Sequence, residues 1–154
     1  MKPEQYFLRY AFPCAFVLLN QKRITKEEYD ELEKAFYETK VLSREKLESV
    51  FASAFRRIKA LAKGKDYWDI EVLREYFVSY HNQCIDEGEG DYSKFPKDFR
   101  ELCKVKKCRI LKKEEDVLTV EMDGVKKAVL GKILPEAKEN DYVYVHLGVA
   151  VEKI

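Results

Sequence analysis

Residues 117–130 read VLTVEMDGVKKAVL, two runs rich in apolar and β-branched residues on either side of Asp123-Gly124. An Asp-Gly pair between two such runs is the strongest short hairpin signal in the chain, because both residues accept the positive φ of a tight turn. The stretch therefore predicts two antiparallel strands, Val117 to Met122 and Val125 to Leu130.

The segments around this hairpin continue the two-residue period. Val105 to Leu111 precedes it, and Tyr142 to Val151 follows it, interrupted at His146-Leu147-Gly148 where a bulge or turn fits. About five short strands so close together predict a small closed or partly open barrel, since closure removes exposed strand edges. Alternation along the strands predicts that barrel-interior residues include Val120, Val129, Val143 and Val145.

The residues before this region follow a helical period. Thr25 begins a capping-box pattern, Ser43 and Asp66 are candidate caps of two further helices, and Gly64 is a stop signal. Ahead of them, Tyr6 to Asn20 is apolar on all sides and contains Pro13, which marks a start or a kink. We therefore expect an α+β protein, with an N-terminal bundle of four helices followed by a small C-terminal OB-like β-barrel.

The best candidate for a domain boundary is the acidic, glycine-bearing stretch from Asp86 to Asp91, DEGEGD. Such residues favour turns and solvent over packing, and Pro96 follows shortly after. The sequence predicts a helical domain over residues 1–98, of unknown function, and a barrel domain over residues 99–154.

Charge and hydropathy exclude some classes of partner. The 29 basic and 28 acidic residues nearly cancel, so no global field draws the chain to nucleic acid or to an anionic membrane. The longest apolar run, Ala11 to Leu19, is roughly half as long as a membrane span and contains a proline. The first residues also lack the pattern of a secretory signal. We expect a cytoplasmic protein with neither membrane nor nucleic acid as a partner.

The four cysteines are too few and too far apart for a disulfide framework, and none belongs to a Cys-x-x-Cys pair. His81 and Cys84 are three residues apart on a predicted helix, so they share a face and are candidate metal ligands. Cys108 is either a further metal ligand or a small apolar filler. Cys14 follows Pro13 and could lie in the first turn of a helix, where backbone dipoles make a thiol more reactive, but its apolar neighbours favour a core thiol.

The end of the chain, from Asn140 to Lys153, reads NDYVYVHLGVAVEK. It resembles the C-terminal signature of the HypC/HupF family, Gly-Asp-Tyr-Val-Leu-Val-His-Val-Gly-Phe-Ala, followed by an apolar residue and commonly Glu-Lys. Upstream, Val120 to Val129 resembles the hairpin of that family, and Leu134 to Lys138 fits the loop before its signature. The resemblance covers the last third of the chain.

This resemblance implies an accessory protein of nickel-iron hydrogenase maturation. Proteins of the family dock on a HypD-type scaffold or on the precursor of the hydrogenase large subunit, and help carry the iron with its cyanide and carbonyl ligands. They are chaperones and not enzymes. The resemblance therefore implies two protein partners, no tightly bound cofactor and, at most, transient iron.

The resemblance also implies site residues. The iron-associated thiol of the family lies in a segment Met-Cys-Leu-x-Ile-Pro-Gly-Lys, onto which the register places Leu102 to Arg109. Cys103 falls on the family cysteine and His146 on the signature histidine, so these two are the candidates for binding iron or a partner. The Pro-Gly of the segment is absent, and Cys108 stands in place of its glycine. A thiolate and an imidazole suit low-spin iron.

Two other classes of function remain open. In the first, the chain is a metal-binding or redox protein that uses thiols from both domains together with His81. In the second, the barrel binds oligonucleotides, which the balanced charge argues against.

Overall fold

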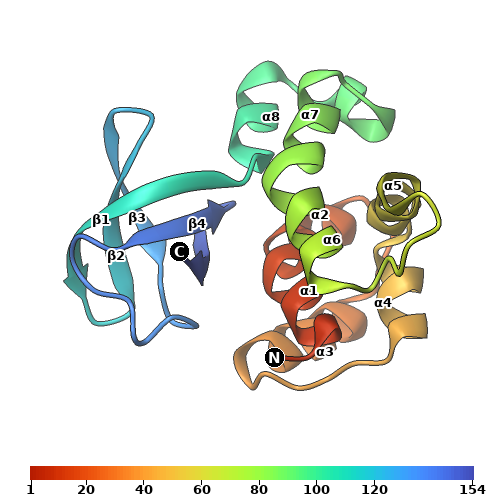
Figure 1. Ribbon diagram of the computed structural model, residues 1–154, viewed down its shortest axis with the longest axis horizontal. Helices are drawn as coiled ribbons and strands as arrows, with labels where there is room; N and C mark the ends of the chain where they lie inside the picture. The colour runs from red at the N-terminus through yellow and green to blue at the C-terminus, as the bar shows by residue number, and fades with distance from the viewer. The chain divides into compact units, whose positions relative to one another are not determined.

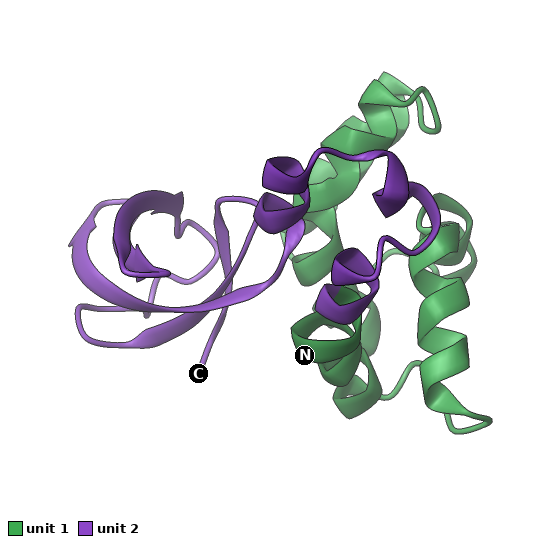
Figure 2. Cartoon of the chain, turned by 90° about the horizontal axis from the view of Figure 1, so that it is seen from above, with its two compact units in different colours: residues 1–81 green, residues 82–154 purple.

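A computed structural model describes residues 1–154, and the chain forms two compact units, residues 1–81 and residues 82–154 (Figure 2). Helices make up the first part of the chain and a closed five-stranded barrel ends it, which confirms the predicted α+β class (Figure 1). None of the helices is both long and apolar enough to cross a bilayer.

The first unit is helical throughout. Its elements are α1 (Pro3–Ala11), the 3₁₀ turn η1 (Phe12–Cys14), α2 (Ala15–Asn20), α3 (Lys26–Tyr37), α4 (Arg44–Val50), α5 (Ala52–Ala62), α6 (Ile70–Glu75) and the π-helical turn η2 (Tyr76–Tyr80). His81 follows η2 directly and begins α7 (His81–Asp86).

Two predicted caps are confirmed. The Thr25 hydroxyl accepts a hydrogen bond from the Glu28 backbone N–H at 3.1 Å, and the Glu28 carboxylate accepts one in return from the Thr25 backbone N–H, also at 3.1 Å. The Ser43 hydroxyl accepts from the backbone N–H of Lys46 at 3.2 Å. These side chains satisfy N–H groups that the first turn of a helix leaves without a partner.

The prediction of four helices is wrong in detail. The apolar segment that starts the chain is divided at Phe12 into α1, η1 and α2, and the helix after Ser43 is broken at Phe51, whose φ of −104° and ψ of 44° are not helical. The helix expected from Asp66 starts later, because Asp69 supplies the cap by accepting from the backbone N–H of Glu71 at 2.8 Å.

Aromatic packing holds the first unit together. The fully buried ring of Phe7 lies 4.5 Å from the ring of Phe55, 5.6 Å from Phe77 and 5.9 Å from Trp68, measured between centroids. Tyr10 stacks on Phe77 at 5.0 Å. Each such pair adds to the free energy gained from burial alone, so α1 is the central element of the helical core.

The second unit contains the rest of α7, two short helical elements and the barrel. Its further elements are η3 (Gly90–Lys94), α8 (Lys97–Cys103), β1 (Lys106–Glu114), β2 (Val117–Met122), β3 (Val125–Leu130), β4 (Tyr142–His146) and β5 (Val149–Lys153). The strand order around the closed barrel is β1-β2-β3-β5-β4. All pairs are antiparallel except β3 with β5, which are parallel.

Two tight turns set the register of the barrel. Asp123 and Gly124, with φ of 51° and 78°, join β2 to β3, as the sequence predicted. Leu147 and Gly148, with φ of 45° and 78°, join β4 to β5 at the predicted interruption. Positive φ at both central residues matches the twist of the strands that such a turn connects.

The barrel interior is apolar and well filled. It is formed by buried side chains from all five strands and the loop before β4: Cys108, Ile110, Leu118, Val120, Val129, Leu134, Ala137, Val143, Val145 and Ala150. The four valines predicted to point inward are among them, so that prediction is confirmed.

Hydrogen bonds and an ion pair connect α7, at the start of the second unit, to the residues directly before β1. The Asn82 side-chain amide donates to the Val105 carbonyl oxygen at 2.8 Å and accepts from the Val105 backbone N–H at 2.9 Å. Lys104 forms an ion pair with Asp86 at 2.5 Å. The compact units therefore divide after His81, earlier than the boundary after Asp98 that the sequence predicted, and independent folding on either side of Asp98 stays a prediction.

Truncating Val120 to Ala should lower the free energy of unfolding by about 2 kcal/mol, because the change leaves a cavity in a closed interior. The matched control is Val125→Ala on the neighbouring strand β3, where the side chain is 55% exposed and the cost should stay below about 0.5 kcal/mol. Urea denaturation of both variants, with hydrogen exchange of the barrel amides, measures the difference. Equal losses would contradict the inward orientation of Val120.

Candidate functional site

His146, the candidate from the family signature, is the last residue of β4 and is fully buried. It pairs across the strands with Val149, on the other side of the two-residue turn. A histidine at this position is held by strand pairing on one side and by a tight turn on the other. Its backbone is therefore fixed by the same turn that fixes the register of β4 and β5.

Cys103, the second candidate, is the last residue of α8 and is almost fully buried. Burial raises the pKa of its thiol to about 11 from the ordinary 9.0, because a thiolate loses hydration there without gaining a partner. Metal ligation by cysteine requires the thiolate. At neutral pH the side chain is therefore a protonated thiol.

Cys108 lies on β1 and belongs to the barrel interior. Its Sγ is 3.7 Å from the Lys106 carbonyl oxygen, to which the thiol donates. Burial, followed by the nearby Asp123 carboxylate, raises the pKa of this thiol to about 11. Of the two interpretations that the sequence left open, these contacts favour the small apolar filler.

A cavity of about 450 Å³ opens in the second unit, between the end of α8, the β2-β3 hairpin and the β4-β5 turn. Its lining has apolar and charged members: Asp98, Glu101, Leu102, Lys104, Lys106, Met122, Asp123, Lys127, Ala128, Val129, Val145, Leu147 and Gly148. We call it the α8–barrel groove. Cys103 and His146 are not part of the lining, but each lies in the chain between two residues that are.

Ion pairs fix one side of the α8–barrel groove. The Lys104 ammonium lies 2.7 Å from the Glu101 carboxylate, and Lys106 forms ion pairs with both Glu101, at 3.4 Å, and Asp123. The hydrogen bond from Lys104, more than any other contact, lowers the pKa of the Glu101 carboxyl group. Leu102, between these charged residues, exposes 53% of its surface.

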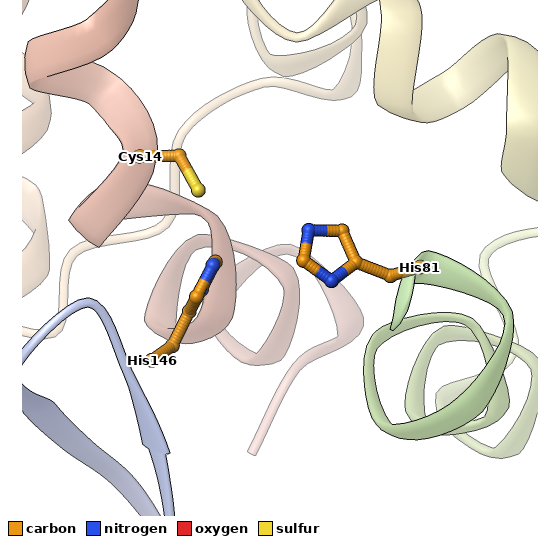
Figure 3. Close-up of side chains that lie close together, drawn as sticks. All are labelled: Cys14, His81 and His146. Atoms are coloured by element: carbon orange, nitrogen blue, oxygen red, sulfur yellow. The ribbon is translucent and has the colours of Figure 1, made fainter. Parts of the chain in front are cut away.

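Two residues of the first unit bring a thiol and an imidazole together. Cys14 ends η1, His81 follows the π-helical turn η2, and the Cys14 Sγ lies within 4.8 Å of an imidazole nitrogen of His81 (Figure 3). His81 is buried, whereas Cys14 is only partly buried, so the prediction of a core thiol at Cys14 is wrong. His146, also drawn in Figure 3, belongs to the barrel unit.

The sequence predicted a different partner for His81. Cys84 lies on α7 three residues after His81, as expected, and its side chain is buried. The thiol that the structure places beside His81 comes instead from a distant part of the chain. A spacing rule within one helix could not find Cys14, because only the packing of η1 against other helical segments brings the two together. Metal binding by His81 and Cys84 stays a prediction.

The two buried thiols Cys103, at the end of α8, and Cys108, in the barrel, should make the free energy of unfolding depend on pH. Because the folded-state pKa values are raised from 9.0 to about 11, the folded protein holds protons that the unfolded chain releases. This contribution is complete below about pH 9 and is lost as the pH rises through 11. Over that window, wild type should lose up to about 4 kcal/mol more than a Cys103→Ala/Cys108→Ala variant, about 2 kcal/mol from each thiol, measured by urea denaturation. Parallel losses in the two proteins would contradict the assignment.

Comparison with known proteins assigns a family to one part of the chain only. No curated protein matches the sequence, and the N-terminal part has no family match. Residues 108–154 match the HupF/HypC family. The matched residues comprise most of β1, all of β2 to β5 and the loops between them. The resemblance predicted from the sequence is therefore confirmed: the C-terminal third of the chain is similar to the HupF/HypC family.

Proposed function

We propose that this chain is a HypC-like chaperone of nickel-iron hydrogenase maturation, a binding protein and not an enzyme, which acts in the cytoplasm. Its second unit docks on a HypD-type scaffold or on the precursor of the hydrogenase large subunit. One observation carries the proposal. The residues that match the HupF/HypC family, 108–154, are the residues that build the closed barrel.

The α8–barrel groove is the docking surface in this proposal. Its exposed Leu102 and the side chains of Met122 and Leu147 offer apolar contact area, and the ion-paired lysines around them offer directional contacts. Apolar contact supplies most of the binding free energy in such a patch, whereas charges at its rim mainly select the partner. The family signature contributes Val145, Leu147 and Gly148 to this lining, so the surface includes residues of the family match.

We favour docking on a partner over iron transfer through Cys103 as the role of the second unit. Burial raises the pKa of the Cys103 thiol to about 11, so the thiol stays protonated at pH 7. The thiol is also almost fully buried, which disfavours direct contact with an iron centre. We therefore propose that the barrel holds a partner that carries the iron, and that Cys103 itself contributes packing.

A co-purification experiment tests the proposal. The full chain, a HypD-type scaffold and a large-subunit precursor are co-expressed, and the affinity of each pair is measured with purified proteins. Leu102→Asp should weaken docking roughly tenfold or more, because it puts an uncompensated charge into an apolar contact. The matched control is Val117→Asp, since Val117 is 41% exposed on β2 and lies outside the groove lining. Wild-type protein that binds neither partner would refute the function, and equal weakening by both variants would refute the groove as its surface.

The second test concerns the thiol. Cys103→Ala should leave the affinity for the scaffold within about twofold of wild type, with or without iron on the scaffold, because truncating a packed thiol removes no contact at the groove lining. The affinity is measured by calorimetry under anaerobic conditions. Iron-dependent loss of binding in Cys103→Ala, with the melting temperature unchanged, would show that Cys103 is an iron ligand.

A further inference from the structure

We infer that Cys14 and His81 form a binding site of the helical unit for a divalent metal ion of the zinc class. The inference does not depend on the proposed docking function, and both donors lie in the part of the chain that has no family match. The inference rests on the distance between the two donors, on the backbone that presents them and on the surroundings of His81.

The distance between the donors suits one shared ion. Zinc binds thiolate sulfur at about 2.3 Å and imidazole nitrogen at about 2.0 Å, so in tetrahedral geometry the two donor atoms are about 3.6 Å apart. The Cys14 Sγ and the nearest imidazole nitrogen of His81 already lie within 4.8 Å of each other. Figure 3 shows the sulfur and the ring directed toward the same space. The pair is therefore close to the separation that one shared ion requires.

The backbone departs from α-helix at both donors. Before Cys14, the chain makes a 3₁₀ turn, with the Ala15 backbone N–H donating to the Phe12 carbonyl oxygen. Before His81, it makes a π-helical turn, with the His81 backbone N–H donating to the carbonyl oxygen of Tyr76, five residues earlier. A π turn places the residues after it on a different face of the helix, and such turns occur frequently at functional sites. Here it sets the direction of the His81 side chain.

Aromatic rings enclose one side of His81. The Tyr76 ring meets the imidazole edge-on, with centroids 5.8 Å apart and an angle of 75° between planes, and the Phe77 ring centroid lies 6.1 Å away. An apolar surrounding of this kind limits the access of water and fixes the orientation of a ligand. Cys14 is partly exposed, so an ion can enter from its side.

The donor set selects the class of metal. A thiolate and an imidazole suit zinc and neighbouring first-row ions, whereas calcium and magnesium require oxygen donors. The two side chains fill two of four tetrahedral positions and leave the others to water or to a ligand delivered from outside. Binding replaces the thiol proton of Cys14 by the metal, so one proton is released for each ion bound.

A cobalt titration of the reduced full chain under anaerobic conditions tests the site. Co²⁺ bound to a thiolate gives a charge-transfer absorption in the near ultraviolet, and Zn²⁺ should displace the cobalt. We expect one ion per chain. In Cys14→Ser this absorption should disappear and the affinity should fall roughly tenfold or more. The matched control is Cys84→Ser, which removes a buried thiol of α7 and should keep both the absorption and the affinity.

A second measurement uses wild-type protein, so it does not depend on the folding of a variant. Alkylation of native protein by iodoacetamide should occur first at Cys14, the only cysteine that is not buried, and saturating Zn²⁺ should protect that residue. The modified residue is identified by mass spectrometry. Unprotected Cys14, or equal metal binding by wild type and Cys14→Ser, would overturn the inference. Neither result would bear on docking of the barrel to its partners.

Discussion

Closure of the barrel rests on one short parallel contact between β3 and β5, on which the enclosed interior of the second unit depends. Leu130 is paired with Val149, and the Leu130 backbone N–H donates to the Gly148 carbonyl oxygen at 2.9 Å. Next to this contact, a Cβ atom on Gly131 would lie 2.6 Å from Cγ of the fully buried Leu118. Glycine at this position therefore lets the chain approach the interior closely enough for the two strands to meet.

The β-structure could be predicted closely because short-range chemistry determines it. The Asp123-Gly124 pair has one favoured turn geometry, and the alternation of apolar residues then fixes which side chains point inward. In the helical unit, local signals gave the caps at Thr25 and Ser43 but missed the break at Phe51. That residue is buried with its ring 5.4 Å from the ring of Phe7, so a contact between distant segments accompanies the interruption. Helical periodicity alone carries no information about such a contact.

Sequence reasoning predicted less of the candidate site than of the fold. A family register could point to Cys103 and His146, but it could not show that the Cys103 thiol at the end of α8 is buried and that burial raises its pKa. Conversely, no motif links Cys14 to His81, since the two lie at opposite ends of the first unit's sequence. Chemistry that depends on burial, or on packing between distant turns, becomes visible only once the tertiary structure is known.

In this chain, binding a partner and presenting a thiol to a metal are expected in different units, whereas the family resemblance implied both for the barrel. In the HupF/HypC-type proteins, one module is expected both to bind a partner and to present a thiol to iron. Here Cys103 and Cys108 are both buried, and burial holds both thiols in the protonated form. The exposed leucine and the fixed charges of the α8–barrel groove remain suited to docking. Cys14 is the one thiol open to solvent, and it belongs to the helical unit. The proposed metal binding therefore belongs to the helical unit, and the proposed docking belongs to the barrel.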